Sequence, residues 1–285
     1  MKTVKIIESP ADALHSNYPL IPTKDKIAYY QALLKVGFDT LDCGSFISPK
    51  TIPQIADIDD VIKGLDCSDF KTKLLTKIAN LSDAIGAIKF KNINYLGYPF
   101  SISENFQIRN TGKTIKESIV ILEQIVKLAK EHEKEVIIYL SMSFGNPYGD
   151  VWSPSVISKW VDQFSAMGIK TISLFDTMGT ARIEDINHLF SSLIPQYSEL
   201  EFGAHFHSQP KSWYDKVNTA FNAGCYRFDG TIKGVGGYQM TQNQLNDNIP
   251  TEKLISYFTS CKKLPNSIDV LAFESAYNFY HKLLR

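Results

Sequence analysis

Short apolar segments alternate with helical patterns along the whole chain, and this alternation restricts the fold more than any other feature. Three times an apolar helix end is followed by a glycine and then by a strand-like run that ends in aspartate. The three copies are residues 36–42, 167–176 and 223–229. A glycine in that place commonly ends a helix. Helices that alternate with strands in this way indicate a parallel sheet.

The pattern predicts eight strands. We expect them at residues 4–7, 38–42, 74–79, 94–98, 136–141, 171–175, 201–205 and 226–229. Amphipathic helices are predicted between them, for example at residues 115–131 and 155–167, and two more follow the last strand. Eight parallel strands in 285 residues favour an α/β protein with a closed (β/α)₈ TIM barrel and extra C-terminal helices over an open sheet. No linker or low-complexity segment interrupts the pattern, so we predict a single domain over residues 1–285.

Charge and cysteine usage narrow the range of partners. The formal net charge is zero and the isoelectric point is near 7.0, which argues against binding to nucleic acid or to anionic lipid. The chain has no run of eighteen apolar residues, so we expect no membrane span. Its four cysteines form no CxxC pair and its first residues turn acidic at Glu8. We therefore expect reduced thiols, no signal peptide and a cytoplasmic location.

Two histidines at the end of the predicted seventh strand are the first candidates for chemistry. His205 and His207 are two residues apart, and alternate side chains of a strand point to the same face. Two imidazoles on one face can bind a single divalent cation. A His-x-His pair is also compatible with two ordinary histidines. The barrel favours the metal interpretation, because active sites of such barrels lie at the C-terminal ends of the strands.

Other polar residues follow the ends of other predicted strands. They are Glu8, Asp12, Asp42, Ser45, Asn80, Ser141, Ser143, Asp176, Thr177, Asp229 and Thr231. One carboxylate and two imidazoles, from Asp12, His205 and His207, suit Mg²⁺, Mn²⁺, Zn²⁺ or Fe²⁺ with positions left open for a substrate. We predict that Ser45, Asn80 and Ser141 bind the substrate, because the same edge of the barrel brings them toward that cation.

Four stretches carry a resemblance to a known family. They are ESPADAL at residues 8–14, DCGSFISPK at 42–50, SLFDTMG at 173–179 and GVGG at 234–237. With His205 and His207 between the last two, the chain resembles hydroxymethylglutaryl-CoA lyases from the first strand to about Leu254. These are metal-dependent TIM-barrel enzymes related to isopropylmalate and homocitrate synthases.

The resemblance implies a set of site residues. The metal ligands of the family fall on Asp12, His205, His207 and Asn248, with Asn246 as a competitor for the last place. The implied cofactor is a divalent metal, with Mg²⁺ or Mn²⁺ favoured and Zn²⁺ as an alternative. Asp42 and Asp176 match carboxylates that the family uses beside the substrate and the metal. We also expect a homodimer, and a small-molecule partner that is an acyl-CoA or a hydroxy or keto acid.

Two positions depart from the family pattern. The family has arginine before the metal-binding aspartate, where this chain has Ala11, and loss of such a cation typically costs about 10²–10³ in rate. The family has a proton-donating cysteine where this chain has Tyr238. A phenol with an ordinary pKa of about 10 is a poor proton donor near neutral pH. We therefore expect impaired catalysis, with Tyr238 as the candidate donor.

Three functions remain open at this point. The first is a metal-dependent lyase or aldolase that cleaves a carbon–carbon bond of a 3-hydroxy acyl-CoA or a related acid. The second is a catalytically inactive pseudoenzyme that serves as a binding partner or subunit, as Ala11 and Tyr238 suggest. The third is a Claisen-type acyl transferase. It ranks last, because the chain lacks the long C-terminal extension of the isopropylmalate synthases.

Overall fold

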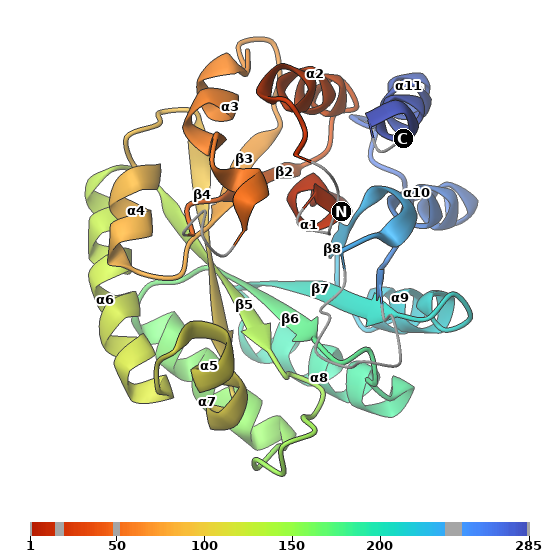
Figure 1. Ribbon diagram of the computed structural model, residues 1–285. Helices are drawn as coiled ribbons and strands as arrows, with labels where there is room; N and C mark the ends of the chain where they lie inside the picture. The colour runs from red at the N-terminus through yellow and green to blue at the C-terminus, as the bar shows by residue number, and fades with distance from the viewer. Residues whose placement is uncertain (1, 15–19, 48–51, 237–246, 284–285) are drawn as a thin grey trace.

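The computed structural model describes residues 2–14, 20–47, 52–236 and 247–283, and its centre is a closed parallel barrel (Figure 1). Its strands are β1 (Lys5–Glu8), β2 (Thr40–Ser45), β3 (Lys73–Lys77), β4 (Ile93–Ser101), β5 (Glu135–Ser141), β6 (Thr171–Asp176), β7 (Glu201–Ser208) and β8 (Arg227–Gly230). Each strand pairs in parallel with its sequence neighbours, and β8 pairs with β1 to close the ring. The predicted TIM barrel is confirmed, and each of its eight strands overlaps a predicted segment.

Helices surround the barrel, and most of the long ones match the sequence pattern. They are α2 (Thr23–Leu34), α6 (Ile115–Glu131), α7 (Pro154–Ala166), α8 (Ile183–Gln196), α9 (Trp213–Asn222), α10 (Thr251–Ser260) and α11 (Val270–Leu283). The side chain of Ser153 caps α7 by accepting a hydrogen bond from Val156 N, and Pro154 is the first helical residue. Thr114 and Glu117 form a capping box that fixes the start of α6.

The sequence patterns missed the short elements. These are α1 (Pro10–Leu14), α3 (Ile58–Gly64), α4 (Leu81–Ala87) and α5 (Glu104–Thr111), the 3₁₀ turns η1 (Pro53–Ile55) and η2 (Ile232–Gly234), and the two-residue strand β9 (Asp247–Asn248). Segments this short contain too few turns or alternations to give a periodic pattern. Two of them are important for the site, because α1 follows β1 and β9 pairs antiparallel with β7.

The repeated glycines end their helices in the left-handed conformation. Gly37, Gly168 and Gly224 have φ values of 81°, 87° and 97°. At Gly37 a Cβ would lie 2.0 Å from the carbonyl oxygen of Ser267, so no other residue fits there without a shift of the backbone. The repeated glycine therefore reflects the left-handed backbone conformation in which each helix ends before the next strand.

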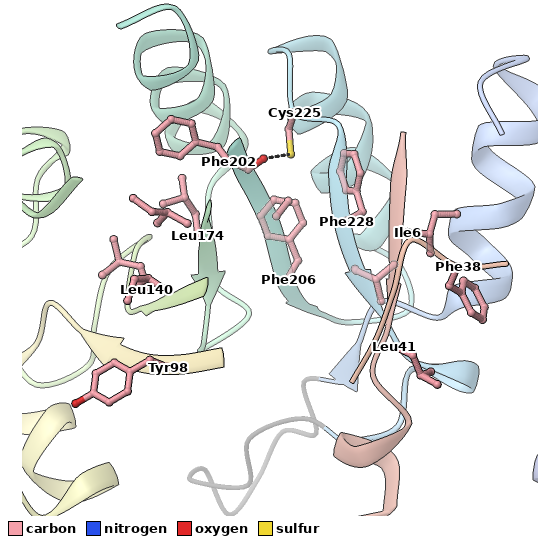
Figure 2. Close-up of a cluster of buried hydrophobic side chains, with 14 of the residues drawn as sticks. Ile6, Phe38, Leu41, Tyr98, Leu140, Leu174, Phe202, Phe206, Cys225 and Phe228 are labelled. Atoms are coloured by element: carbon pink, nitrogen blue, oxygen red, sulfur yellow. Dashed lines mark hydrogen bonds between the residues drawn. The ribbon is translucent and has the colours of Figure 1, made fainter. Parts of the chain in front are cut away.

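The main hydrophobic core lies between the strands and the helices. Figure 2 shows part of it, with Leu41, Leu140, Phe206 and Phe228 in a cluster of buried side chains contributed by different strands. The inside of the barrel holds a second, smaller apolar cluster of Leu75, Ile137 and Tyr139. The rest of the interior is more polar, so the barrel itself supplies the groups available for chemistry.

The C-terminal helices complete the outer layer. α11 packs against α2 (Figure 1), and the rings of Tyr29 and Phe279 stack with their centroids 6.0 Å apart. Tyr29 and Tyr30 are thus packing residues of the outer ring, as expected from their helical pattern. Among the residues that the structure describes, no helix is long and apolar enough to cross a membrane.

Candidate active site

The predicted histidine pair lies at the C-terminal end of β7 and meets a third side chain there. His205 and His207 are both buried, with 3% and 2% of their surface exposed. The pairing of β9 with β7 places the backbone of Asn248 opposite that of His207. This brings Asn248 Oδ1 within 3.0 Å of His205 Nε2. We call His205, His207 and Asn248 the histidine group.

Hydrogen-bond partners fix which ring nitrogen of each histidine faces the site. His207 Nδ1–H donates to the carbonyl oxygen of Thr177 at 2.9 Å, because a carbonyl can only accept. His205 Nδ1 lies 3.5 Å from Asp229 Oδ2, and that carboxylate also accepts a hydrogen bond from Ser173. The carbonyl at Thr177 fixes the proton of His207 on Nδ1 and leaves its Nε2 lone pair available to a ligand. At His205, Nε2–H donates to Asn248 Oδ1 in this structure, so a bound cation would take the place of that proton.

Burial keeps His207 neutral. Burial, reinforced by the neighbouring His205, lowers the pKa of His207 to about 3. Burial opposes the charge of Asp229, yet hydrogen bonding and charge at His205 and the charge of Arg227 lower the pKa of that carboxyl. An ionised carboxylate behind an imidazole is the arrangement that orients metal-binding histidines.

The opposite side of the barrel mouth carries charge. Asp12 lies on α1, Asp42 on β2, and Lys77 is the last residue of β3. Lys77 Nζ lies 2.5 Å from Asp12 Oδ1 and 3.1 Å from Asp42 Oδ2. The register of β2 against β3 shifts between Asp42 and Ser45, which marks a bulge that bends the strand next to this ion pair. We call Lys77, Asp12 and Asp42 the lysine group.

Burial and charge act in opposite directions on the lysine group. Burial raises the pKa of Asp42 to about 6, although Lys77 works against this shift. Burial also opposes the charge of Lys77, but Asp12 and Asp42 outweigh it and raise the pKa of the ammonium above its ordinary value. Lys77 is therefore a cation at neutral pH.

The donor chemistry of the predicted metal ligands fits a divalent cation, with one qualification. A separation of 3.0 Å between His205 Nε2 and Asn248 Oδ1 is about the spacing of adjacent ligands around an ion with bonds of about 2.1 Å. His207 presents a third donor. However, no three His, Cys, Asp or Glu side chains of the described segments are grouped as a metal site. Asp12 is instead paired with Lys77, so its role as the fourth ligand stays a prediction.

Asp176 holds the loop after β6 and contacts the histidine group through a lysine. Its carboxylate accepts hydrogen bonds from the backbone N–H groups of Thr180 and Ala181 and from Lys216 Nζ, the last at 2.6 Å. Lys216 also donates to the carbonyl oxygen of His207 at 2.9 Å. Asp176 thus positions β7 and its histidines, and its oxygens are already engaged in this network.

The remaining predicted site residues divide into three cases. Asn80 follows β3 and caps α4 by accepting a hydrogen bond from Asp83 N. Ser45 and Ser141 end β2 and β5 at the same edge of the barrel, and Ser45 Oγ accepts from Ile47 N. Tyr238 and Asn246 lie outside the described residues. The structure places the first three at the mouth, and their contact with substrate stays a prediction.

Sequence reasoning missed one residue that completes the site, Lys77, which ends β3. Thr177 and Asp229 were among the polar residues expected at the strand ends, but the sequence pattern assigned them no role. A lysine after the apolar residues Leu74 and Leu75 was a signal that could have been read, because a buried strand rarely ends in an unpaired cation. Its partners were not visible, since Asp12 is 65 residues away in the chain.

Ala11 does not face open space. It is 2% exposed and borders a cavity of about 20 Å³ together with Lys26, Tyr30 and Cys43. Such a cavity holds about one water molecule, far less than an arginine side chain. The small residue at this position is therefore matched to its packing.

Comparison with known proteins supports the resemblance found in the sequence. A model of the HMGL-like family matches residues 11–279. A cytoplasmic 3-hydroxy-3-methylglutaryl-CoA lyase of Danio rerio is 28% identical over 284 residues, which cover 99% of this chain and 83% of that protein. The hydroxymethylglutaryl-CoA lyase YngG of Bacillus subtilis is 28% identical over 273 residues, or 89% of this chain and 90% of that protein.

Solved structures agree. The HMG-CoA lyase of Bacillus subtilis superposes with a TM-score of 0.91 at 26% identity, over 99% of this chain and 94% of that one. An HMG-CoA lyase from Acinetobacter baumannii, solved in complex with coenzyme A and 3-methylmalate, gives a TM-score of 0.89 at 26% identity over 99% and 91% of the two chains. The shared barrel extends over nearly the whole chain.

Proposed function

Because the chain belongs to the HMGL-like family, we propose that it is a divalent-metal-dependent lyase that cleaves a carbon–carbon bond of a 3-hydroxy acyl-CoA or a related hydroxy acid. Hydroxymethylglutaryl-CoA is the first substrate to test, since the relatives are lyases of that compound. The observation that carries the proposal is the histidine group, in which two buried imidazoles and an amide oxygen converge, with Asn248 Oδ1 3.0 Å from His205 Nε2.

The histidine group would hold the cation, with Asp12 as a further ligand. A bound divalent cation supplies Lewis-acid polarisation of the substrate's hydroxyl and carbonyl oxygens. Thr177 holds the proton of His207 on Nδ1, so that this ring presents Nε2. Asp229, 3.5 Å from His205 Nδ1, would hold the proton of that ring once a cation replaced the contact between Nε2 and Asn248. Lys216 and Asp176 fix the backbone of β7 under the two rings.

Asp42 is the best-placed group to accept the substrate's hydroxyl proton. Its pKa, raised to about 6 by burial, lies close to neutral pH, where a general base is most effective. Asp176 is less suited to this role, because its carboxylate is occupied by two backbone N–H groups and Lys216. Asp176 is therefore a positioning residue, and Tyr238 remains the proposed proton donor.

A pseudoenzyme is the second candidate, and Ala11 is the observation that favours it. The small cavity beside Ala11 leaves no room for an arginine, so a residue that the resemblance places next to the metal is absent from this position. In that case the barrel would bind a divalent cation and an acyl-CoA or acid without turning it over.

One experiment separates the two candidates. The purified protein is treated with EDTA, reloaded with Mn²⁺ or Mg²⁺, and assayed for acetyl-CoA release from hydroxymethylglutaryl-CoA. We expect release that needs the metal and that is lost in His207→Ala but retained in His188→Ala, because His188 is exposed on α8. Metal binding without any release would support the pseudoenzyme, and absence of metal binding would contradict both candidates.

A further inference from the structure

Lys77 projects into the barrel mouth because of its position on β3. It lies two residues after Leu75, which packs inside the barrel, and residues two apart on a strand share a face. As the last residue of β3 it lies at the C-terminal edge, with 20% of its side chain exposed. The ammonium is therefore at the upper end of the interior, where a substrate would enter.

The surroundings of Lys77 connect it to the histidine group. Its Nζ contacts Asp12 and Asp42 and lies 5.7 Å from the ring centroid of Tyr139. The same ring packs edge-to-face against His205, with the centroids 5.7 Å apart. One buried aromatic ring thus contacts both the cation and the imidazole, which places both beside the same side chain of β5.

Lys77 differs from the other buried lysines in what it contacts. Lys216 is fully engaged by one carboxylate and two carbonyl oxygens. Lys26 contacts Asp57 and the carbonyl oxygen of Gln54 in the outer layer. Lys77 contacts two carboxylates, and within the described part of the chain no third oxygen acceptor is present for it. An ammonium has three N–H donors, so one remains for a ligand.

We propose that Lys77 is a catalytic residue whose ammonium donates a hydrogen bond to the substrate oxygen on which negative charge develops during cleavage. The inference rests on the proposed lyase function. Position 11 offers no cation beside Asp12, and Lys77 delivers one to the same carboxylate from β3. A preorganised cation at a developing oxyanion is typically worth about 10²–10³ in rate.

The reaction step balances without a further reactant. Asp42 takes the hydroxyl proton, and the O–H electron pair becomes the new carbon–oxygen double bond. The carbon–carbon bond breaks, and its electron pair moves onto the thioester, where the enolate oxygen accepts a hydrogen bond from Lys77. The enolate carbon then takes a proton from the proposed donor, Tyr238, which yields acetyl-CoA, and the proton on Asp42 returns to Tyr238 through solvent. One proton leaves the hydroxyl and one reaches carbon, so no oxidant or water is consumed.

The first test measures Mn²⁺ affinity, which does not depend on turnover. In Lys77→Met a positive charge next to Asp12 is removed, so we expect apo protein to bind Mn²⁺ about tenfold or more tightly in calorimetric titration. Lys77→Arg keeps the charge and should bind as wild type does. Lys26→Met is the matched control, because it breaks another buried ion pair, with Asp57 at 2.7 Å, and its partners Asp57 and Gln54 belong to neither group. Weaker Mn²⁺ binding by Lys77→Met would mean that Lys77 only holds Asp12 in place, and would overturn the proposal.

The second test measures catalysis, and a binding measurement takes its place if wild type is inactive. If wild type releases acetyl-CoA, Lys77→Met should lower kcat at least about 100-fold with KM within a few-fold, and Lys77→Arg should recover part of the loss. An unchanged kcat would overturn the proposal. If wild type releases no acetyl-CoA, the proposed lyase function fails. The role of Lys77 is then tested by measuring malate binding to the Mn²⁺-loaded protein. At least tenfold weaker binding by Lys77→Met would support its contact with an anionic ligand, and equal affinity would refute it.

Discussion

The histidine group and the lysine group face each other across the barrel mouth, but different forces hold them. Each imidazole is oriented by a partner behind it, Thr177 O for His207 and Asp229 for His205. The lysine group is held together by its own charges, with Lys77 between Asp12 and Asp42. The first group keeps its geometry whatever occupies the site, whereas the second depends on the charge present. The comparison teaches that the histidine group, which is proposed to bind the cation, and the lysine group, in which charges balance one another, lie on separate strands of this barrel.

The largest effect is expected when a side chain proposed to bind the metal is removed from the histidine group. His207→Ala deletes one nitrogen ligand, so we expect at least about a 100-fold loss of Mn²⁺ affinity in a calorimetric titration. His188→Ala on α8 is the control and should bind as wild type does. If His207→Ala bound Mn²⁺ normally, the histidine group would not be the metal site.

A smaller effect is expected from the partner behind the ring. Asp229→Asn keeps the shape but weakens the preference for a proton on His205 Nδ1, which should lower Mn²⁺ affinity about 10–100-fold. Asp229 also influences Arg227, so Asp39→Asn serves as the control, because Asp39 contacts the same guanidinium at 3.5 Å. Equal losses in both variants would assign the effect to Arg227 instead of His205.

Packing beside the lysine group gives the third prediction. Ala11→Arg forces a long side chain into surroundings with a cavity of about 20 Å³, and overpacking of this kind typically costs about 1–3 kcal/mol in the free energy of unfolding. Denaturant unfolding of the variant measures it. Leu271→Arg is the control, since Leu271 is 75% exposed. A variant as stable as wild type would show that α1 can turn residue 11 outward.

The last prediction concerns Glu8, a buried carboxyl group at the end of β1. Glu8 on β1 accepts hydrogen bonds from Ile232 N and Thr251 Oγ1, and burial raises its pKa to about 8 from 4.5. The folded state then binds a proton that the unfolded state has lost. The free energy of unfolding should therefore fall as pH rises between about 4.5 and 8, by up to about 1.4 kcal/mol per pH unit.

Glu8→Gln tests this directly, because it keeps the shape and removes the titration. Denaturant unfolding at several pH values should show a flatter profile for Glu8→Gln than for wild type. Glu199→Gln, at an exposed glutamate, should leave the slope unchanged. A profile that is equally steep in Glu8→Gln would assign the pH dependence to other groups.

The sequence by itself determined the barrel and one half of its site. Alternating strands and helices with a glycine before a strand appear as local patterns, because each is fixed by backbone geometry within a few residues. His205 and His207 could be read in the same way, since they share one strand. The resemblance to lyases added Asn248, which the pairing of β9 with β7 then brought to His205.

The other half of the site, the lysine group and its surroundings, was decided only by the tertiary structure. Lys77 meets Asp12 across 65 residues of chain, and α1, which carries Asp12, has five residues and no periodic signal. The restricted space around Ala11 is likewise made by side chains from several elements. Strand order, a β-bulge and a short helix together place these groups, and none of them leaves a repeating pattern in the sequence. Charges that meet only through the fold are invisible to local periodicity, because the energy that pairs them depends on distance in space and not on spacing in the chain.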